Sequence, residues 1–473
     1  MTAESEGPSA DAEPQAPVSA GMRQFLVPLI LPGVLQGKAQ TFVSPMLPLF
    51  VVELGGSHSM VGTIASAYAV AQFFGSAPAP WLHLNKTVKK HSQGTVRLGP
   101  RRKALQVGVV MQHLHYATAA CMALSLQVTT AVLSFVSQSV YVLLGIRIVG
   151  GIGATAFDIS RKAYIAAEVP SSIRGRVVAF LASLQKWAVM ISALLSGIVA
   201  EHMATRSVFL VQALLSLSAM LLIAGHRIVS SQRREAESFP GPNEGTATTN
   251  STRSPPRPTQ TLSLFGVLGA HWRSLVGAGL YCAMLTGVRN TWMVALPLRG
   301  HHIGLSKVGI GVAVAGFRAC DASITFLAAG HIMDKYGLKA AAIPSMILMG
   351  AAFALLSTVR NPVMLGVAAV VAGVGNGICG GIVNAFATGL APAHARTQFL
   401  GLWKTVTAIG GILLPPLFGA VSDVTSLDIA DFCVSAAAFV AVAWILLMVR
   451  EIAPKAARDT QVTVSLAAPS PVP

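Results

Sequence analysis

Charged residues are scarce in this sequence, and acidic residues are scarcer than basic ones. Asp, Glu, Lys and Arg together make up 11% of the chain, whereas soluble domains carry roughly 25%. Hydrophobic residues make up 53% of the chain, and its mean hydropathy is +0.63. A soluble protein of this composition would expose too much apolar surface to water. The composition therefore excludes an ordinary soluble domain.

The sequence also lacks the residue patterns of metal sites and of common enzymes. Its five cysteines are scattered singly, with no C-x-x-C pair and no Cys/His spacing, which excludes a disulfide framework and a zinc site. It contains no Walker loop, so ATP does not drive it directly, and no nucleophile elbow. We therefore expect a protein that is not an enzyme and that binds neither a metal nor a cofactor.

What the sequence does contain is a series of long apolar segments. The hydrocarbon core of a bilayer, about 30 Å thick, is crossed by a helix of about 20 apolar residues. Helices are expected because every amide in lipid must bond within its own segment. Twelve segments meet this requirement: 25–51, 60–82, 104–133, 139–165, 176–200, 206–228, 274–298, 307–330, 339–359, 362–390, 397–421 and 429–449. The sequence thus predicts an all-α integral membrane protein with twelve transmembrane helices.

The formal net charge of +16 comes from 34 Lys and Arg against 18 Asp and Glu, a balance that would also suit nucleic-acid binding. The distribution of the basic residues indicates membrane topology instead. With the N-terminus inside, only Arg206, Arg299, Lys307 and Arg360 fall in outer loops, and most of the others lie in cytoplasmic loops and tails. The basic run from Lys86 to Lys103 is a topology anchor or a contact for anionic lipids. We expect both termini in the cytoplasm, a plasma or inner membrane as the location, and no nucleic acid as a partner.

Internal repetition divides the chain into two halves of six predicted helices. One constant spacing pairs Leu47 with Leu296, Gly55 with Gly304, Ser57 with Ser306 and Gly62 with Gly311, and a second pairs Gly151 with Gly373 and Gly197 with Gly419. The predicted bundles span 23–229 and 273–450, with a cytoplasmic linker over 230–272 and cytoplasmic tails over 1–22 and 451–473. The linker and tails are predicted to be disordered, because they contain too few apolar residues to form a core.

A charged turn, Gly330-His-Ile-Met-Asp334-Lys335-Tyr-Gly337-Leu-Lys339, lies between two predicted helices. It resembles the cytoplasmic-loop motif of the major facilitator superfamily, in which a glycine-bent turn joins helices two and three of each half. The resemblance implies two pseudo-symmetric six-helix bundles with a substrate site between them near mid-membrane. It also implies gating by Gly330, Asp334, Lys335 and Gly337. The first copy, Trp81-Leu-His-Leu-Asn85-Lys86, has Asn85 at the aspartate position, so only Asp334 keeps the carboxylate expected to lock the inner face.

A second resemblance lies in the fourth predicted helix. Arg147-Ile-Val-Gly-Gly151-Ile-Gly153 is similar to the R-x-x-x-G-x-G signature of proton-coupled members of the superfamily, which implies a coupling role for Arg147. Asp158 and Arg161, one turn apart, are expected to form an ion pair, with a gating role as the alternative. The Gly-Pro pair of drug/proton antiporters is missing from the fifth helix, because residues 177–200 contain no proline. This absence weakens the antiporter interpretation.

Charged residues inside the predicted helices are the clearest indication of function. The basic residues Lys38, Arg147, Lys186, Arg289, Arg318 and Lys404 face only two acidic residues, Asp158 and Asp321. Arg318 and Asp321 share a helix face and are expected to pair, or else Asp321 carries a proton. Helices one, four, seven and ten line the cavity in the superfamily, so Lys38 and Arg289 are predicted to hold an anionic group from the two halves, with snorkelling to the membrane surface as the alternative. The predicted substrate-binding residues are Lys38, Lys186, Arg289, Arg318, Asn376 and Asn384.

We therefore expect a monomeric secondary transporter that moves a small organic anion across the membrane by alternating access, with protons as the candidate coupling ion. One alternative is an antiporter that exports hydrophobic or cationic compounds against protons, with Asp321 as the proton carrier. A second alternative is a receptor or scaffold derived from a facilitator, which binds a small molecule but does not transport it. The altered first loop motif, with Asn85 in place of aspartate, suggests this second alternative.

Overall fold

The computed structural model describes residues 29–76, 116–169, 171–237, 264–392 and 395–448. These residues are almost entirely helical and contain no strand, which confirms the predicted all-α class. Nine of the helices in these ranges are long and apolar enough to cross a membrane. Each of the twelve predicted segments overlaps one helix or a broken pair of helices.

The first half of the described chain contains seven helices: α2 (Leu31–Val43), α3 (Leu47–Glu53), α4 (His58–Ser76), α6 (Tyr116–Val136), α7 (Val140–Glu168), α8 (Ser171–His202) and α9 (Ser207–Glu237). The second half contains α10 (Leu264–His302), α11 (Lys307–Ile324), the π-helix η4 (Thr325–Ala329), α12 (Gly330–Tyr336), α13 (Leu338–Thr358), α14 (Pro362–Ile378), α15 (Ile382–Leu390), α16 (Arg396–Val424) and α17 (Leu427–Met448). Two predicted segments, 25–51 and 362–390, are each broken into two helices. Helices α9 and α10 extend into the two ends of the predicted linker over 230–272, and residues 238–263 lie outside the described residues.

The sequence repeat extends to the conformation of the backbone. Gly55 follows α3 with φ of +78°, and Gly304 follows α10 with φ of +75°. A positive φ is strained for any residue with a side chain, so both turns require glycine. Because these two glycines are equivalent in the repeat, the same tight turn leads into α4 in one half and into α11 in the other.

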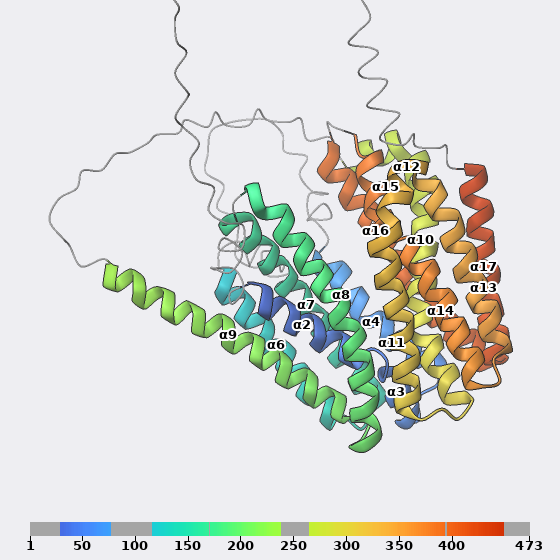
Figure 1. Cartoon of the computed structure of the whole chain (residues 1–473), viewed down its shortest axis with the longest axis horizontal. Coiled ribbons are helices and arrows are strands. Elements are labelled where there is room, and N and C mark those ends of the chain that lie inside the picture. The colour runs from blue at the N-terminus through green and yellow to red at the C-terminus, as the bar shows by residue number, and fades with distance from the viewer. Residues whose placement is uncertain (1–28, 77–115, 170, 238–263, 393–394, 449–473) are drawn as a thin grey trace, which may run out of the picture.

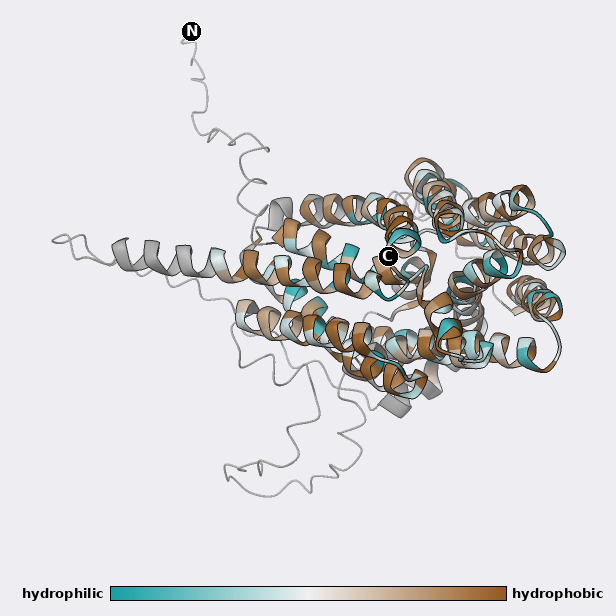
Figure 2. Cartoon of the chain, turned by 90° about the horizontal axis from the view of Figure 1, so that it is seen from below, coloured by the Kyte–Doolittle hydropathy of each residue, from teal (hydrophilic) through white to brown (hydrophobic). Residues whose placement is uncertain are grey.

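The two halves pack side by side, and two pairs of helices join them (Figure 1). Helix α8 of the first half packs against α11 of the second, and α4 packs against α16. Hydrophobic residues make up most of the helices in Figure 2. Many of them, including Leu214, Leu413 and Val440, are exposed on the outside of the bundle. An exposed apolar exterior of this kind is stable in lipid and not in water, as expected for an integral membrane protein.

Glycines bring the two halves into close contact at one end of the bundle. A Cβ atom on Gly197 of α8 would lie 2.6 Å from the backbone oxygen of Lys307, and one on Gly62 or Gly419 would overlap the backbone of Pro415 or His58. No side chain fits at these positions unless the halves separate. We call this end, where α4 and α11 begin and α8 and α16 end, the closed end.

Candidate functional site

Two adjoining cavities lie between the halves. The larger, of about 490 Å³, is lined by residues of α2, α4, α7 and α8 from the first half and of α10 and α16 from the second. The smaller, of about 230 Å³, extends toward Pro48 of α3 and Pro415 of α16. Gln40 of α2 and Asn290 of α10 line both cavities, so an amide from each half stands where they meet. A solute there would contact both halves at once.

The larger cavity has charged groups in its wall. Asp158 of α7 forms ion pairs with Arg161 at 2.7 Å and with Lys162 at 2.6 Å, so the predicted pairing one turn apart is observed. Arg161 and Asp158 line the cavity together with Lys404 of α16. Within this wall, two basic residues accompany a single acidic one, and the amides of Gln36, Gln40, Gln185 and Asn290 add neutral hydrogen-bonding groups.

Arg147 of α7 lies in the wall of the smaller cavity. Its guanidinium stacks 4.9 Å from the centre of the Tyr68 ring of α4. The Arg147 Nε and the Tyr68 hydroxyl are both buried and have no hydrogen-bond partner in the described part of the chain. No carboxylate among the described residues pairs with Arg147 either. Holding a cation away from water without a counter-charge is costly.

Four predicted site residues come together beside the cavities, and we call them the interface cluster: Lys186 of α8, Arg289 of α10, and Arg318 and Asp321 of α11. Asp321 lies 4.0 Å from both the Lys186 Nζ and the Arg318 Nη1, so the predicted Arg318–Asp321 pairing is observed as a long ion pair. Arg289 lies near enough to Lys186 and Arg318 to repel both electrostatically. The cluster thus holds three basic groups around one acid and bridges the two halves. Arg318 also donates a hydrogen bond of 2.9 Å to the sulfur of Met293, which lines the smaller cavity.

Other predicted site residues lie elsewhere. Lys38 does not line either of these two cavities, although Gly37, Gln40 and Thr41 of the same helix do. Asn376 of α14 is buried, with its Oδ1 lacking a hydrogen-bond partner among the described residues, and Asn384 of α15 is exposed. Both asparagines are absent from the walls of the two cavities.

The charged turn that resembles the family motif forms α12 and the start of α13. Gly337 has φ of +90°, a conformation that requires glycine, and it separates the two helices. Asp334 and Lys335 are exposed, and the Asp334 carboxylate makes no hydrogen bond or ion pair with any described residue. Gly330 begins α12, and Asn85 of the first motif copy lies outside the described residues.

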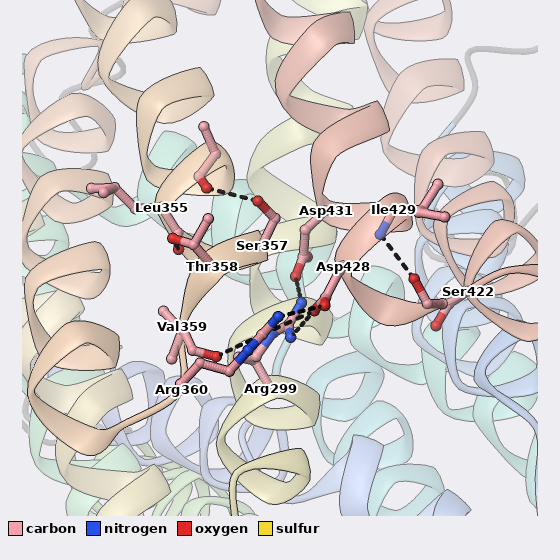
Figure 3. A network of polar contacts seen from close by, with 12 residues as sticks. Arg299, Leu355, Ser357, Thr358, Val359, Arg360, Ser422, Asp428, Ile429 and Asp431 are labelled. Atoms are coloured by element: carbon pink, nitrogen blue, oxygen red, sulfur yellow. Dashed lines mark hydrogen bonds and ion pairs between the residues drawn. The ribbon is translucent and has the colours of Figure 1, made fainter.

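A buried ion network corrects two predictions (Figure 3). Arg299, predicted to lie in an outer loop, is fully buried in α10, where its Nη2 donates a 2.5 Å hydrogen bond to Asp431 and its Nη1 donates to Asp428. Arg360 also pairs with Asp428, at 2.8 Å. The prediction that Asp158 and Asp321 are the only acids within the membrane segments is therefore wrong, because Asp431 lies within the predicted segment 429–449 and is fully buried in α17. Since Asp431 is paired with Arg299, it does not neutralise the basic groups at the cavities.

Comparisons with known proteins agree with this architecture. A search of curated proteins gives no significant match. Among solved structures, the nucleoside transporter NupG is 12% identical, with a TM-score of 0.64, and the alignment covers 90% of this chain and 98% of that chain. A POT family transporter in complex with a thioalcohol-conjugated peptide is also 12% identical, with a TM-score of 0.63, covering 90% of this chain and 96% of that one. The human organic anion transporter MFSD10 is 16% identical, with a TM-score of 0.54 and coverage of 91% and 100%.

Such low identities show a shared fold and nothing about the solute. The sequence model of the Major Facilitator Superfamily, however, matches residues 33–298 and 278–470, which together span most of the chain. The expected charged turn, the repeat and the helical architecture agree with this match. The chain is thus an integral, multi-pass membrane protein and belongs to the Major Facilitator Superfamily of transporters.

Proposed function

We propose that this protein is a secondary transporter that carries a small organic anion across the membrane by alternating access. The observation that carries the proposal is Arg147, a half-buried arginine in a cavity wall whose Nε is buried without a hydrogen-bond partner and which has no carboxylate partner among the described residues. Holding a cation near the centre of a bilayer costs about 2.5 to 3.5 kcal/mol. A carboxylate or phosphate on the substrate would offset this cost through charge-assisted hydrogen bonds.

The size and lining of the cavities support a small solute. Their volumes, about 490 and 230 Å³, fall in or near the range of roughly 300 to 1,000 Å³ that is usual for small-molecule sites. In our proposal, Arg147 and Tyr68 hold the anionic group, and Gln40 and Asn290 contact the rest of the substrate from opposite halves. Contacts from both halves would tie substrate binding to their relative movement.

The interface cluster adds a second source of positive charge. Lys186 and Arg318 pair with the single carboxylate of Asp321, and Arg289 lies near both basic groups, which leaves basic groups in excess next to the smaller cavity. We propose that these residues attract the anion and that Asp321 is the candidate proton carrier. Lys38 and Arg289 remain proposed contacts in another state of the cycle, because each neighbours a cavity-lining residue on its helix. The human organic anion transporter MFSD10 has the same fold.

Transport by the purified full chain in proteoliposomes tests the proposal. We would measure uptake of labelled organic anions, organic cations and neutral nucleosides of similar size, with and without a pH gradient. Arg147→Gln should weaken anion binding roughly 10- to 100-fold, the amount expected for losing a hydrogen bond to a charged group. Arg147→Lys should retain part of the affinity. Arg206→Gln, which removes an exposed cation outside both cavities, is the matched control.

The same experiment separates the alternatives. A coupling role for Arg147, which its sequence motif implies, predicts that Arg147→Gln abolishes accumulation driven by a pH gradient but leaves anion binding intact. Uptake of organic cations that is unaffected by Arg147→Gln would replace the anion proposal with a cation/proton antiporter. Substrate binding without any flux would support a receptor or scaffold.

A further inference from the structure

The first backbone amides of two helices at the closed end are bound by carboxylates of the opposite half. Asp423, near the end of α16 in the second half, accepts hydrogen bonds of 2.8 Å from the amides of both His58 and Ser59 of α4. Glu201, near the end of α8 in the first half, accepts a hydrogen bond of 2.6 Å from the amide of Lys307, the first residue of α11. Each carboxylate therefore caps a helix that belongs to the other half.

Such caps have a clear physical basis. The first amides of a helix have no partner within the helix, and the partial positive charge at a helix N-terminus attracts an anion. In most proteins the capping side chain belongs to the residue just before the helix. Helices α4 and α11 have such caps in Ser57 and Ser306, which accept hydrogen bonds from the amides of Met60 at 3.4 Å and Gly309 at 3.1 Å. The carboxylates from across the interface bind earlier amides of the same helices, and these additional bonds hold only while the two halves touch at this end.

The two contacts are copies of each other. Asp423 is the repeat equivalent of Glu201, because the two are separated by the same spacing as Gly197 and Gly419. Lys307 is likewise the repeat equivalent of His58, because they are separated by the same spacing as Ser57 and Ser306. The glycines follow the same rule, since Gly197 faces the backbone of Lys307 and Gly419 faces the backbone of His58. An incidental surface contact would not recur at both symmetry-related positions.

Side chains reinforce each copy in a different way. The Lys307 Nζ forms an ion pair of 2.9 Å with Glu53 and donates a hydrogen bond of 2.6 Å to Thr205, so α11 is held by its side chain as well as its amide. The ring of His58 makes a 2.8 Å hydrogen bond with the hydroxyl of Ser422. Among the residues that the structure describes, the contact through Glu201 thus includes an additional ion pair, and the contact through Asp423 includes none.

We infer that Glu201 and Asp423 are paired latches that hold the closed end shut and so set the balance between the two access states of the transporter. They act at the end opposite to Asp334, which lies in the charged turn of α12. The inference depends on alternating access but not on the charge of the substrate. A cation transporter with this structure would have the same latches.

Distance measurements between spin labels test the latches in the full chain without needing a substrate. One label pair crosses the closed end, at the exposed positions Met203 and His302, and a second crosses the opposite end, at the exposed positions Ala163 and His331. Both pairs are placed in a variant without native cysteines, reconstituted in lipid nanodiscs. Glu201→Gln, Asp423→Asn and the double variant keep the size of each side chain and remove its charge.

Asp428→Asn is the matched control. Asp428 also lies at this end and pairs with arginines, but its partners Arg299 and Arg360 belong to its own half. The amide oxygens of Gln and Asn can still accept the backbone hydrogen bonds, so the variants remove only the attraction between a negative charge and the helix N-terminus. Each latch variant should therefore raise the ratio of open to closed distances across the closed end by roughly two- to fivefold. The double variant should raise it by roughly four- to 25-fold if the two effects add.

The distances across the opposite end should shorten in the same samples, because opening one end of an alternating-access transporter closes the other. This reciprocal change would support the inference. Unchanged closed-end distances in the double variant would overturn it, and so would an equal shift in Asp428→Asn. Broadened distances at both ends would also count against it, since they would indicate loosening of the fold and not a change of access state.

Discussion

Asp431→Asn is expected to destabilise the second half of the protein strongly. The Arg299 side chain is fully buried, and its two acidic partners differ in environment, because Asp431 is fully buried while the Asp428 side chain is 40% exposed (Figure 3). The substitution keeps the shape of Asp431 and removes its charge. Asp428 alone, shared with Arg360 and partly in contact with solvent, would then have to compensate a buried guanidinium.

The magnitude follows from this difference in burial. Removing one partner of a buried ion pair typically costs about 3 to 5 kcal/mol, because the other charge stays buried without compensation. Removing a partly exposed carboxylate typically costs about 1 kcal/mol or less. If the second half unfolds as a unit of about 185 residues, Asp431→Asn should lower its midpoint of thermal unfolding by roughly 6 to 20 °C, and Asp428→Asn by roughly 4 °C at most.

Thermal unfolding of the purified protein in one detergent, followed by tryptophan fluorescence and by loss of the monomer peak in size-exclusion chromatography, would measure both shifts. Asp431→Asn and Asp428→Asn remove one negative charge each, so any effect of net charge cancels between them. Equal shifts in the two variants would refute the reasoning, because the cost would then not depend on burial. If the double variant with both Asp428→Asn and Asp431→Asn is as stable as Asp431→Asn alone, then Asp428 does not stabilise Arg299 in the absence of Asp431.

Three further predictions concern packing, coupling and gating. Gly410→Ala should lower stability by about 1 to 3 kcal/mol and impair transport, because the added Cβ would overlap the backbone of α10, whereas Gly145→Ala, with no atom within 4 Å, should behave like the native chain in the same assays. Asp321→Asn should abolish accumulation driven by a pH gradient but preserve exchange of labelled for unlabelled substrate. Equal loss of both modes would exclude Asp321 as the proton carrier. Asp334→Asn should reduce uptake more than Asn85→Ala at matched surface amounts, since only residue 334 retains a carboxylate, and equal reductions would show that the difference between the motif copies has no mechanistic role.

The helices could be predicted from the sequence because their apolar segments have the length that a bilayer requires. The breaks inside two of these segments are not visible in hydropathy, because both parts of each broken segment are apolar. The break between α2 and α3 does have a sequence signal, since Pro45 lies in it and Pro48 stands in the first turn of α3. Gly381, with φ of +89°, supplies the second break, but a glycine in an apolar run fits a continuous helix equally well by sequence alone.

The position of the candidate site could be predicted only to within one residue on three helices. Gly37, Gln185 and Asn290 line the larger cavity, and each is the immediate neighbour of a predicted substrate contact. One residue corresponds to a rotation of about 100° around a helix axis. The sequence favoured the charged neighbours Lys38, Lys186 and Arg289, because charge is visible in a sequence while the rotation of a helix against its partners is not.

The sequence also does not reveal which residues form ion pairs or hydrogen bonds with the charged side chains. Arg299 lies next to a predicted helix end, where an exposed cation is ordinary, and its burial depends on Asp431, which is 132 residues away. The latch residues Glu201 and Asp423 resemble any acids at the ends of apolar segments. Their spacing matched the internal repeat, but only the structure places each of them at the start of a helix in the opposite half.

The crossed arrangement of the latches has a consequence for the origin of the chain. In a symmetric homodimer, if residue i of one subunit contacts residue j of its partner, then residue j of the first subunit also contacts residue i of the partner. Such an interface is called isologous. Glu201 binding Lys307 and Asp423 binding His58 follow this rule, with the two halves in the place of two subunits. The closed end thus has the geometry of an isologous dimer interface between two six-helix units, as expected if the chain arose by joining two copies of such a unit. A single half, expressed alone with its own copy of both positions, would carry a surface complementary to itself.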